Sequence, residues 1–236
     1  MRKNETAARL ARGIDTWIFD LDDTLYPRDS GLYEQMLARV IELIQTAVGL
    51  DAVEAGRLHA EYYDRYGTSM IGLSRHHGIP PQRFFDFVHQ VDLTAIGEGH
   101  HLRTALAALP GRRIVFTNGS RLHAQRVLQQ LELTKLFSGI CDIEACEFVG
   151  KPSRSAYEML IRQHDIEPSC TMMFDDRAVN LQAAFELGLK TVLVNPTSWS
   201  GQSYVDAVTD DLACFLTAAA HDGWRGEARI RLPANP

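Results

Sequence analysis

The stretch TWIFDLDDT, residues 16–24, is the most informative part of this sequence of 236 residues. Its first four residues are apolar or β-branched and do not alternate with polar residues, a pattern typical of a parallel strand that is covered on both faces. Three carboxylates follow, at Asp20, Asp22 and Asp23. Because ligands of open α/β sheets bind beyond the carboxyl ends of the strands, the stretch predicts a buried strand that ends at a ligand site.

Four further short apolar runs have the same character, and helical patterns lie between the later ones. The strands are predicted at residues 113–116, 139–143, 171–174 and 191–194. The helices are predicted at residues 122–131, 155–164 and 180–187, with Gly188 as a C-cap after the last one. This alternation predicts an α/β fold with a doubly wound parallel sheet, a Rossmann-like core.

The segment between the first two predicted strands is different, because from Leu32 to about Ile96 it contains helical patterns alone. It is too long to be an ordinary crossover loop, so we predict a small helical domain inserted into the core. The predicted boundaries are 12–28 and 97–222 for the discontinuous α/β core, 29–96 for the inserted domain, and 1–11 and 223–236 for flexible tails.

Composition and charge exclude several classes of protein. Hydrophobic residues make up 45% of the chain, which excludes a disordered or fibrous protein. With 24 Lys+Arg against 30 Asp+Glu, the net charge of −6 does not suit a nucleic-acid binder. The sequence shows no apolar run of membrane-spanning length and no signal peptide, and its four cysteines lack zinc-site spacing. We expect a cytoplasmic monomer or small homo-oligomer with no membrane or nucleic-acid partner.

Polar side chains gather where the predicted strands end. They are Asp20, Asp22, Asp23, Thr117, Asn118, Asp175 and Asp176. Carboxylates that are brought together repel one another unless a cation lies between them, and hard oxygen ligands suit Mg²⁺. An alternative is that each acidic pair only starts a turn or caps a helix. That alternative weakens when two strands of one sheet both end in acidic pairs.

Four segments together resemble the motifs of the haloacid dehalogenase superfamily phosphatases. Residues 20–24, DLDDT, resemble the DxDxT signature, and residues 117–119, TNG, resemble the second motif. Lys151 in the sequence GKP resembles the third motif, and residues 174–176, FDD, followed by Asn180, resemble the fourth. All four occur in the family's order, and the inserted helical domain resembles its small cap domain. The joint match is far more specific than any single motif.

A closer resemblance, to the pyrimidine 5′-nucleotidase branch, extends into the cap. It rests on TLYP at 24–27, SGL at 30–32, YY at 62–63, YGT at 66–68, GL at 72–73 and His89. The fourth motif departs from the commonest superfamily pattern, with Asp175 where many members have glycine and Asn180 where many have aspartate. That branch often has an acidic residue and an asparagine there, so the departure supports the closer resemblance.

The resemblance implies a role for each motif residue. Asp20 is the expected nucleophile, which forms an aspartyl-phosphate, and Asp22 is the expected general acid and base. Lys151 is expected to neutralise the phosphate and the Asp20 carboxylate. Thr117 and Asn118, with their backbone N–H groups, are expected to hold phosphate oxygens.

A bound Mg²⁺ is the expected cofactor. The resemblance places it between the Asp20 side chain, the backbone carbonyl of Asp22 and Asp176. Asp175 is expected nearby, through a water molecule or as the residue that positions Lys151, and Asn180 lies in the same motif. The expected enzyme is therefore a Mg²⁺-dependent phosphoric monoester hydrolase.

The expected substrate is a small-molecule phosphate ester, with a pyrimidine nucleoside 5′-monophosphate favoured. Polar groups of the cap should read the base, with Tyr66, Thr68 and His89 as candidates, although packing is the stronger alternative for Tyr66. Other open substrates are phosphoglycolate, a sugar phosphate and flavin mononucleotide. A dehalogenase, a phosphomutase and a non-enzymatic receiver-type module are the alternative functions. Asp22 favours phosphate chemistry over dehalogenation, because a halide leaves without a proton.

Overall fold

The computed structural model describes residues 2–196 and 199–222. Its strands are β1 Thr16–Phe19, β2 Arg112–Phe116, β3 Gly139–Cys141, β4 Thr171–Asp175, β5 Lys190–Val194 and β6 Ala207–Thr209. Its α-helices are α1 Arg2–Leu10, α2 Leu32–Val48, α3 Ala52–Tyr66, α4 Ser69–His77, α5 Pro81–Val88, α6 His100–Ala108, α7 Arg121–Gln130, α8 Arg154–Gln163, α9 Ala178–Glu186 and α10 Leu212–Asp222. Short 3₁₀ helices are η1 Arg28–Ser30, η2 Leu93–Ile96, η3 Thr134–Leu136 and η4 Pro168–Cys170.

The strands form one parallel sheet in the order β3-β2-β1-β4-β5-β6. The chain runs outward from β1 to β3 and then returns to β4 on the other side of β1, so the crevice at the carboxyl ends of β1 and β4 is the switch point. The predicted doubly wound α/β fold is confirmed. β6 was not predicted, because its three residues, Ala-Val-Thr, are too few to give a periodic signal.

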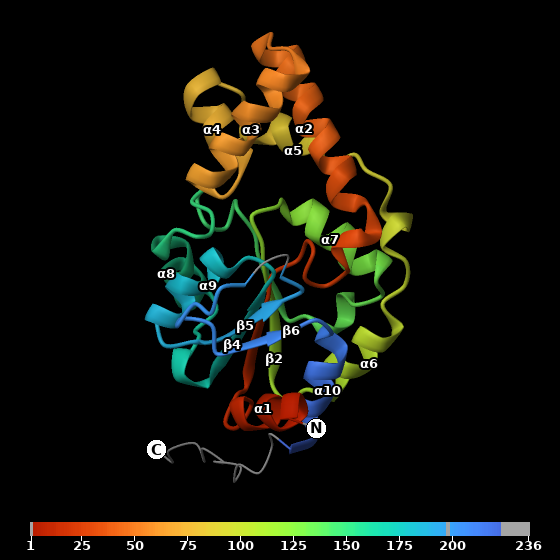
Figure 1. The fold of residues 1–236 in the computed structure, drawn as a ribbon, viewed down its shortest axis with the longest axis vertical. Coiled ribbons are helices and arrows are strands. Elements are labelled where there is room, and N and C mark those ends of the chain that lie inside the picture. The colour runs from red at the N-terminus through yellow and green to blue at the C-terminus, as the bar shows by residue number, and fades with distance from the viewer. Residues whose placement is uncertain (1, 197–198, 223–236) are drawn as a thin grey trace, which may run out of the picture.

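The two faces of the sheet carry two separate hydrophobic clusters. Helices α1, α6, α7 and α10 cover one face of the sheet, and α8 and α9 cover the other (Figure 1). Phe19 belongs to the cluster on the first face and Ile18 to the cluster on the second. Neighbouring residues of β1 thus point to opposite faces and are both buried. This double burial explains the continuous apolar sequence of the strand.

Helices α2 to α5 form the inserted cap, which lies beyond the carboxyl ends of the strands (Figure 1). Its own hydrophobic cluster includes Leu43, Ile44, Met70 and Phe84. Asp51 begins α3 with a capping box: its side chain accepts from the Val53 and Glu54 backbone N–H groups, and the Glu54 carboxylate accepts the Asp51 backbone N–H. The cap is therefore a packed unit that stands over the switch point.

Two parts of the predicted domain division differ from the structure. The segment 1–11 was expected to be a flexible tail, and this was wrong, because residues 2–10 form α1, which packs against α10 with Ala7 and Ala11 buried in the core. Two alanines on a short polar helix, and a third directly after it, give little hydrophobic signal. At the end of the cap, Leu93 and Ile96 of η2 pack in the core cluster, not in the cap cluster. The other predicted tail, 223–236, lies outside the described residues.

None of the helices in the described ranges is both long and apolar enough to span a bilayer.

Candidate active site

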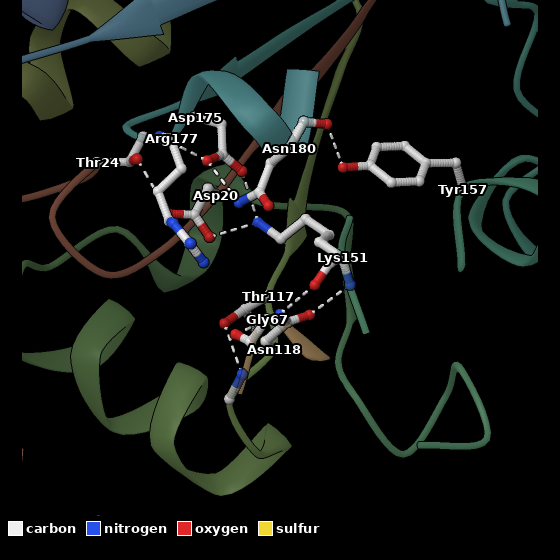
Figure 2. Close-up of polar contacts among 11 residues, drawn as sticks. Asp20, Thr24, Gly67, Thr117, Asn118, Lys151, Tyr157, Asp175, Arg177 and Asn180 are labelled. Carbon is white, nitrogen blue, oxygen red and sulfur yellow. Dashed lines mark hydrogen bonds and ion pairs between the residues drawn. The ribbon is translucent and has the colours of Figure 1, made fainter. Parts of the chain in front are cut away.

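Asp20 stands immediately after β1, at the switch point. Its backbone N–H donates to the carbonyl of Phe174 at 2.9 Å, which continues the pairing of β1 with β4. One carboxylate oxygen accepts the Lys151 ammonium at 2.6 Å and the other accepts the Thr24 hydroxyl at 3.0 Å (Figure 2). Burial raises the pKa of Asp20 to about 7, although Lys151 opposes that shift. A fully ionised Asp20 therefore requires more positive charge than Lys151 alone provides.

Lys151 lies between two carboxylates. Its Nζ donates to Asp20 and, at 2.7 Å, to Asp175, and the side chain is only 1% exposed. Burial alone would lower the pKa of this ammonium, but Asp175 and Asp20 together raise it above its usual value. The second oxygen of Asp175 accepts from the Arg177 backbone N–H at 2.9 Å and from the Asn180 amide at 2.8 Å. Asp175 therefore positions Lys151 and the start of α9.

The Asn118 side chain connects three parts of the molecule. Its Oδ1 accepts the Lys151 backbone N–H at 2.8 Å, and its Nδ2 donates to the carbonyls of Lys151 at 2.9 Å and Gly67 at 3.3 Å. Gly67 lies on the cap with a φ of 75°, and a Cβ there would lie 1.9 Å from the Lys151 carbonyl oxygen. Any side chain at this position would clash with the Lys151 backbone. Glycine at the end of α3 therefore allows the cap to pack closely against the loop that carries Lys151.

One part of the predicted phosphate contact is wrong. The Thr117 backbone N–H donates to the Cys141 carbonyl at 3.0 Å, because the pairing of β2 with β3 continues one residue past the strand. That group is therefore not available to phosphate. The Thr117 side chain lies in the site, where its Oγ1 accepts the Gly119 N–H at 2.9 Å. For Asn118, the remaining candidate donor is the backbone N–H.

Asp22 points into a small network that the sequence did not predict. Its Oδ1 accepts the Tyr26 hydroxyl at 2.6 Å and contacts Nε2 of His123 at 2.7 Å. Burial tends to raise the pKa of Asp22, but the interactions with His123 and Tyr26 outweigh it and lower the pKa to about 2. The one available signal was the position of His123 in the first turn of the helix that follows the TNG motif.

An acidic cluster at the switch point suits a divalent cation. Oxygen atoms of Asp20, Asp175 and Asp176 lie within 4.8 Å of one another. Burial and repulsion from Asp175 and Asp20 raise the pKa of Asp176 to about 8. Oδ1 of Asn180 is also buried without a hydrogen-bond partner among the described residues. Both oxygens of Asp20 and both of Asp175 already accept hydrogen bonds, whereas Asp176 accepts none from the described residues and has only an ion pair with Arg28 at 4.0 Å. Asp176 therefore has the oxygens best placed for a hard cation, with Asp20 beside it in the cluster.

A cavity of about 150 Å³ lies between this cluster and the cap. Its core side includes Asp20, Asp22, Thr117, Asn118, Lys151 and Asp176. Its cap side is lined by the apolar residues Met36, Leu37, Val40, Phe84, Phe85 and Val88, and by Tyr33, His59, Tyr63, Thr68, Ser69 and His89.

The three predicted specificity residues take different positions. Thr68 and His89 line the cavity. The Thr68 hydroxyl accepts the Met70 N–H at 3.3 Å as a helix cap, and Nδ1 of His89 contacts the Ser120 hydroxyl at 3.0 Å. Tyr66 does not line the cavity, and its hydroxyl contacts His76 in an exposed hydrogen bond.

The site can be compared with known proteins. The family model described as haloacid dehalogenase-like hydrolase matches residues 14–188. Phosphate metabolism protein 8 of Saccharomyces cerevisiae is 26% identical over 193 residues, which cover 75% of this chain and only 60% of the length of that relative.

Two solved structures, of proteins with different activities, have folds similar to that of this chain. A 2-haloacid dehalogenase from Pseudomonas syringae pv. tomato DC3000 superposes with a TM-score of 0.57 at 17% identity, over 88% of this chain and 98% of its own. An HAD phosphatase from Thermococcus onnurineus superposes with a TM-score of 0.56 at 17% identity, over 83% and 93%. Likeness at this level of identity shows the fold alone, so the reaction has to be argued from the site.

Proposed function

Because this chain belongs to the haloacid dehalogenase-like hydrolases, we propose that it hydrolyses a phosphate monoester through an aspartyl-phosphate on Asp20. The observation that carries the proposal is the second carboxylate, Asp22, which lines the same cavity as Asp20 and Lys151. A phosphate ester releases an alkoxide, which needs a proton, and we propose that Asp22 supplies it. A dehalogenase releases a halide, and an acid at this position would serve no purpose.

The proposed reaction has two steps. In the first, a carboxylate oxygen of Asp20 forms a bond to phosphorus, the ester P–O bond breaks, and the leaving oxygen takes a proton from Asp22. In the second, a water molecule gives a proton to Asp22 and attacks phosphorus, which releases phosphate and restores Asp20. The Lys151 ammonium offsets the negative charge of both the nucleophile and the phosphoryl group.

The protonation state of Asp22 suits the second step directly. With a pKa of about 2 in the substrate-free site, Asp22 is a carboxylate that can accept a proton from water. The first step needs the protonated form. Negative charge on a bound phosphoryl group raises the pKa of a nearby carboxyl, so substrate binding favours the acid.

The acidic cluster leads to a prediction about metal. Mg²⁺ held by Asp20 and Asp176, with the Asp22 carbonyl as a third proposed ligand, would supply the positive charge that the carboxylates and the phosphate require. Treatment with EDTA should abolish activity, and Mg²⁺ should restore it. Asp176→Ala should raise the Mg²⁺ concentration for half-maximal activity about tenfold or more.

A magnesium titration of the purified variant measures this effect. Asp86→Ala is the matched control and should behave like the unmodified protein, because it removes an exposed cap carboxylate whose one hydrogen bond in the described part of the chain is with Gln82. Full activity in EDTA, or an unchanged Mg²⁺ requirement in Asp176→Ala, would contradict the metal assignment.

The cap residues that line the cavity, its cap wall, indicate which class of phosphate ester the site accepts. Among the described residues that line the cavity, the cap contributes six apolar side chains and no aspartate, glutamate, lysine or arginine. Such a wall suits an uncharged leaving group with a flat apolar face better than it suits the carboxylate of phosphoglycolate. The wall also has a polar pair, in which the Ser69 hydroxyl contacts Nδ1 of His59 at 2.7 Å. We propose a nucleoside 5′-monophosphate as the substrate, with pyrimidine favoured.

A panel of esters tests the substrate class. We expect a higher kcat/KM for UMP and CMP than for AMP, GMP or phosphoglycolate, with released phosphate as the measurement. Ser69→Ala should change the ratio of UMP to AMP by about tenfold, because a buried polar partner left unpaired costs ~1–3 kcal/mol. The same variant should leave the rate with p-nitrophenyl phosphate nearly unchanged.

Tyr66→Phe is the control for the cap, since Tyr66 lies outside the cavity. It should leave the UMP to AMP ratio unaltered. Equal rates for purine and pyrimidine esters, or a much better non-nucleotide ester, would overturn the proposed substrate and leave the proposed reaction standing.

The four cysteines support the compartment that we propose. All four are free thiols, and Cys141 and Cys146 share a hydrogen bond between their sulfur atoms at 3.4 Å, not a disulfide. Free thiols at this spacing fit a reducing environment. We therefore propose a cytoplasmic enzyme that acts on a freely diffusing small-molecule ester.

A further inference from the structure

We propose that His123 is a positioning residue, which holds the Asp22 carboxylate in the orientation that proton transfer requires. This inference rests on the proposed function, because it assumes that Asp22 is the acid and base. His123 has a relative exposure of 0%, and its Nε2 lies 2.7 Å from Oδ1 of Asp22. The two residues are separated by 101 positions in the sequence, so the fold alone brings them together.

The hydrogen bonds of Asp22 divide its two oxygens between two tasks. Both donors, the Tyr26 hydroxyl and the His123 ring, use Oδ1. No described residue donates a hydrogen bond to Oδ2, and Asp22 lines the cavity. A carboxylate held by two donors on one oxygen has a fixed side-chain rotation. Oδ2 can then face the leaving group of the ester, and no change of the Asp22 rotamer is needed before proton transfer.

The His123 ring is itself held in place by its surroundings. The ring of His89 stacks on it, with centroids 4.2 Å apart and planes inclined by 16°. The His123 side chain is also completely buried. The ring therefore cannot rotate away from Asp22 without displacing its neighbours.

The remaining ring nitrogen shows that the contact with Asp22 determines how the ring is placed. Nδ1 of His123 is buried and has no hydrogen-bond partner in the described part of the chain. A histidine placed only for packing or stability would be expected to satisfy both nitrogens, because an unpaired buried polar atom destabilises the fold. The ring keeps one good contact, to the proposed acid, and leaves the other nitrogen without a partner.

His89 connects this arrangement to the cap. It follows α5 directly, it lines the cavity, and its Nδ1 contacts the Ser120 hydroxyl at 3.0 Å. Ser120 is the N-cap of α7, and its hydroxyl also accepts the His123 backbone N–H at 3.3 Å. The end of the cap is thus packed against the residue that orients Asp22.

The test uses two aryl esters that differ by one para-nitro group, phenyl phosphate and p-nitrophenyl phosphate. Phenolate is the stronger base and depends more on a proton from the acid. His123→Leu keeps the bulk of the ring and removes the donor. We expect kcat/KM for phenyl phosphate to fall about tenfold or more, while kcat/KM for p-nitrophenyl phosphate changes less than about threefold.

A conservative variant and a second background separate positioning from packing. In His123→Gln the amide nitrogen can reach the place of Nε2, so most of the phenyl phosphate rate should return. In an Asp22→Asn background, His123→Leu should have little further effect on either ester. Thermal unfolding of each variant checks the fold. If His123→Leu does not fold, His123→Asn replaces it, because its shorter amide falls short of Asp22 and should show the same selective loss.

The outcomes distinguish this inference from the proposed function. If Asp22→Asn shows the selective loss and His123→Leu or His123→Asn does not, the positioning role is wrong and the phosphatase proposal stands. Equal losses with both esters, or a full loss that persists in the Asp22→Asn background, also overturn the positioning role. If Asp22→Asn itself shows no selective loss, both the acid assignment and the role of His123 are wrong.

Discussion

Replacement of Asp20 by asparagine is expected to lower kcat by about 10⁶-fold, the scale seen when a covalent nucleophile is removed. An amide nitrogen does not attack phosphorus, and the rest of the site stays in place. The amide oxygen can still accept the Lys151 ammonium that now lies 2.6 Å from Asp20. The fold should be retained, because asparagine has the shape of aspartate and removes one of several carboxylates that repel one another in this cluster.

Two measurements check the result. Steady-state release of p-nitrophenolate gives kcat, and the mass of the acid-quenched enzyme shows whether a phosphoryl group is attached. The unmodified protein should gain the mass of one phosphoryl group during turnover and Asp20→Asn should not. Asp29→Asn, on the exposed 3₁₀ helix η1, is the matched control. A variant that retains near-normal kcat, or that still forms the phosphoenzyme, would rule out Asp20 as the nucleophile.

The sequence predicted the sheet and the core of the site because both depend on short, continuous signals. Each buried strand leaves an uninterrupted apolar run, and Asp20, Thr117 and Asp175 follow such runs directly, whereas Lys151 was located by its motif alone. Parallel strands bring their carboxyl ends to one edge of a sheet. Asp20, Thr117 and Asp175 could therefore be placed near one another before the structure was known.

The parts that could not be predicted depend on contacts between distant segments. The His123 contact with Asp22 and the Asn118 contact with Gly67 join the core to remote helices and loops. The position of Tyr66 was equally hidden: Tyr63 and Tyr66 are one turn apart on the same side of α3, yet Tyr63 lines the cavity and Tyr66, the last residue of the helix, does not. α1 was missed because its sequence has few large apolar residues. The contact with α10, which buries Ala7, becomes visible in the structure.

Asp22→Asn is expected to separate substrates by their leaving groups. The rate with UMP should fall by ~10²–10⁴-fold, the usual contribution of a positioned acid, because an alkoxide cannot leave readily without a proton. The rate with p-nitrophenyl phosphate should fall much less, since nitrophenolate is a weak base. The comparison uses kcat/KM, which reports the steps up to departure of the leaving group and is not affected by slow hydrolysis of the phosphoenzyme.

Asparagine at position 22 tests proton transfer with little change in structure. Its amide oxygen can accept the Tyr26 hydroxyl and the His123 ring in place of Oδ1, which now receives them at 2.6 and 2.7 Å. Tyr26→Phe is a useful comparison, because it removes one of these donors and leaves the carboxyl group able to carry a proton. It should show a smaller loss with UMP than Asp22→Asn does. Equal losses of Asp22→Asn with UMP and p-nitrophenyl phosphate would mean that Asp22 does not protonate the leaving group, and the distinction from dehalogenase chemistry would have to rest on other residues.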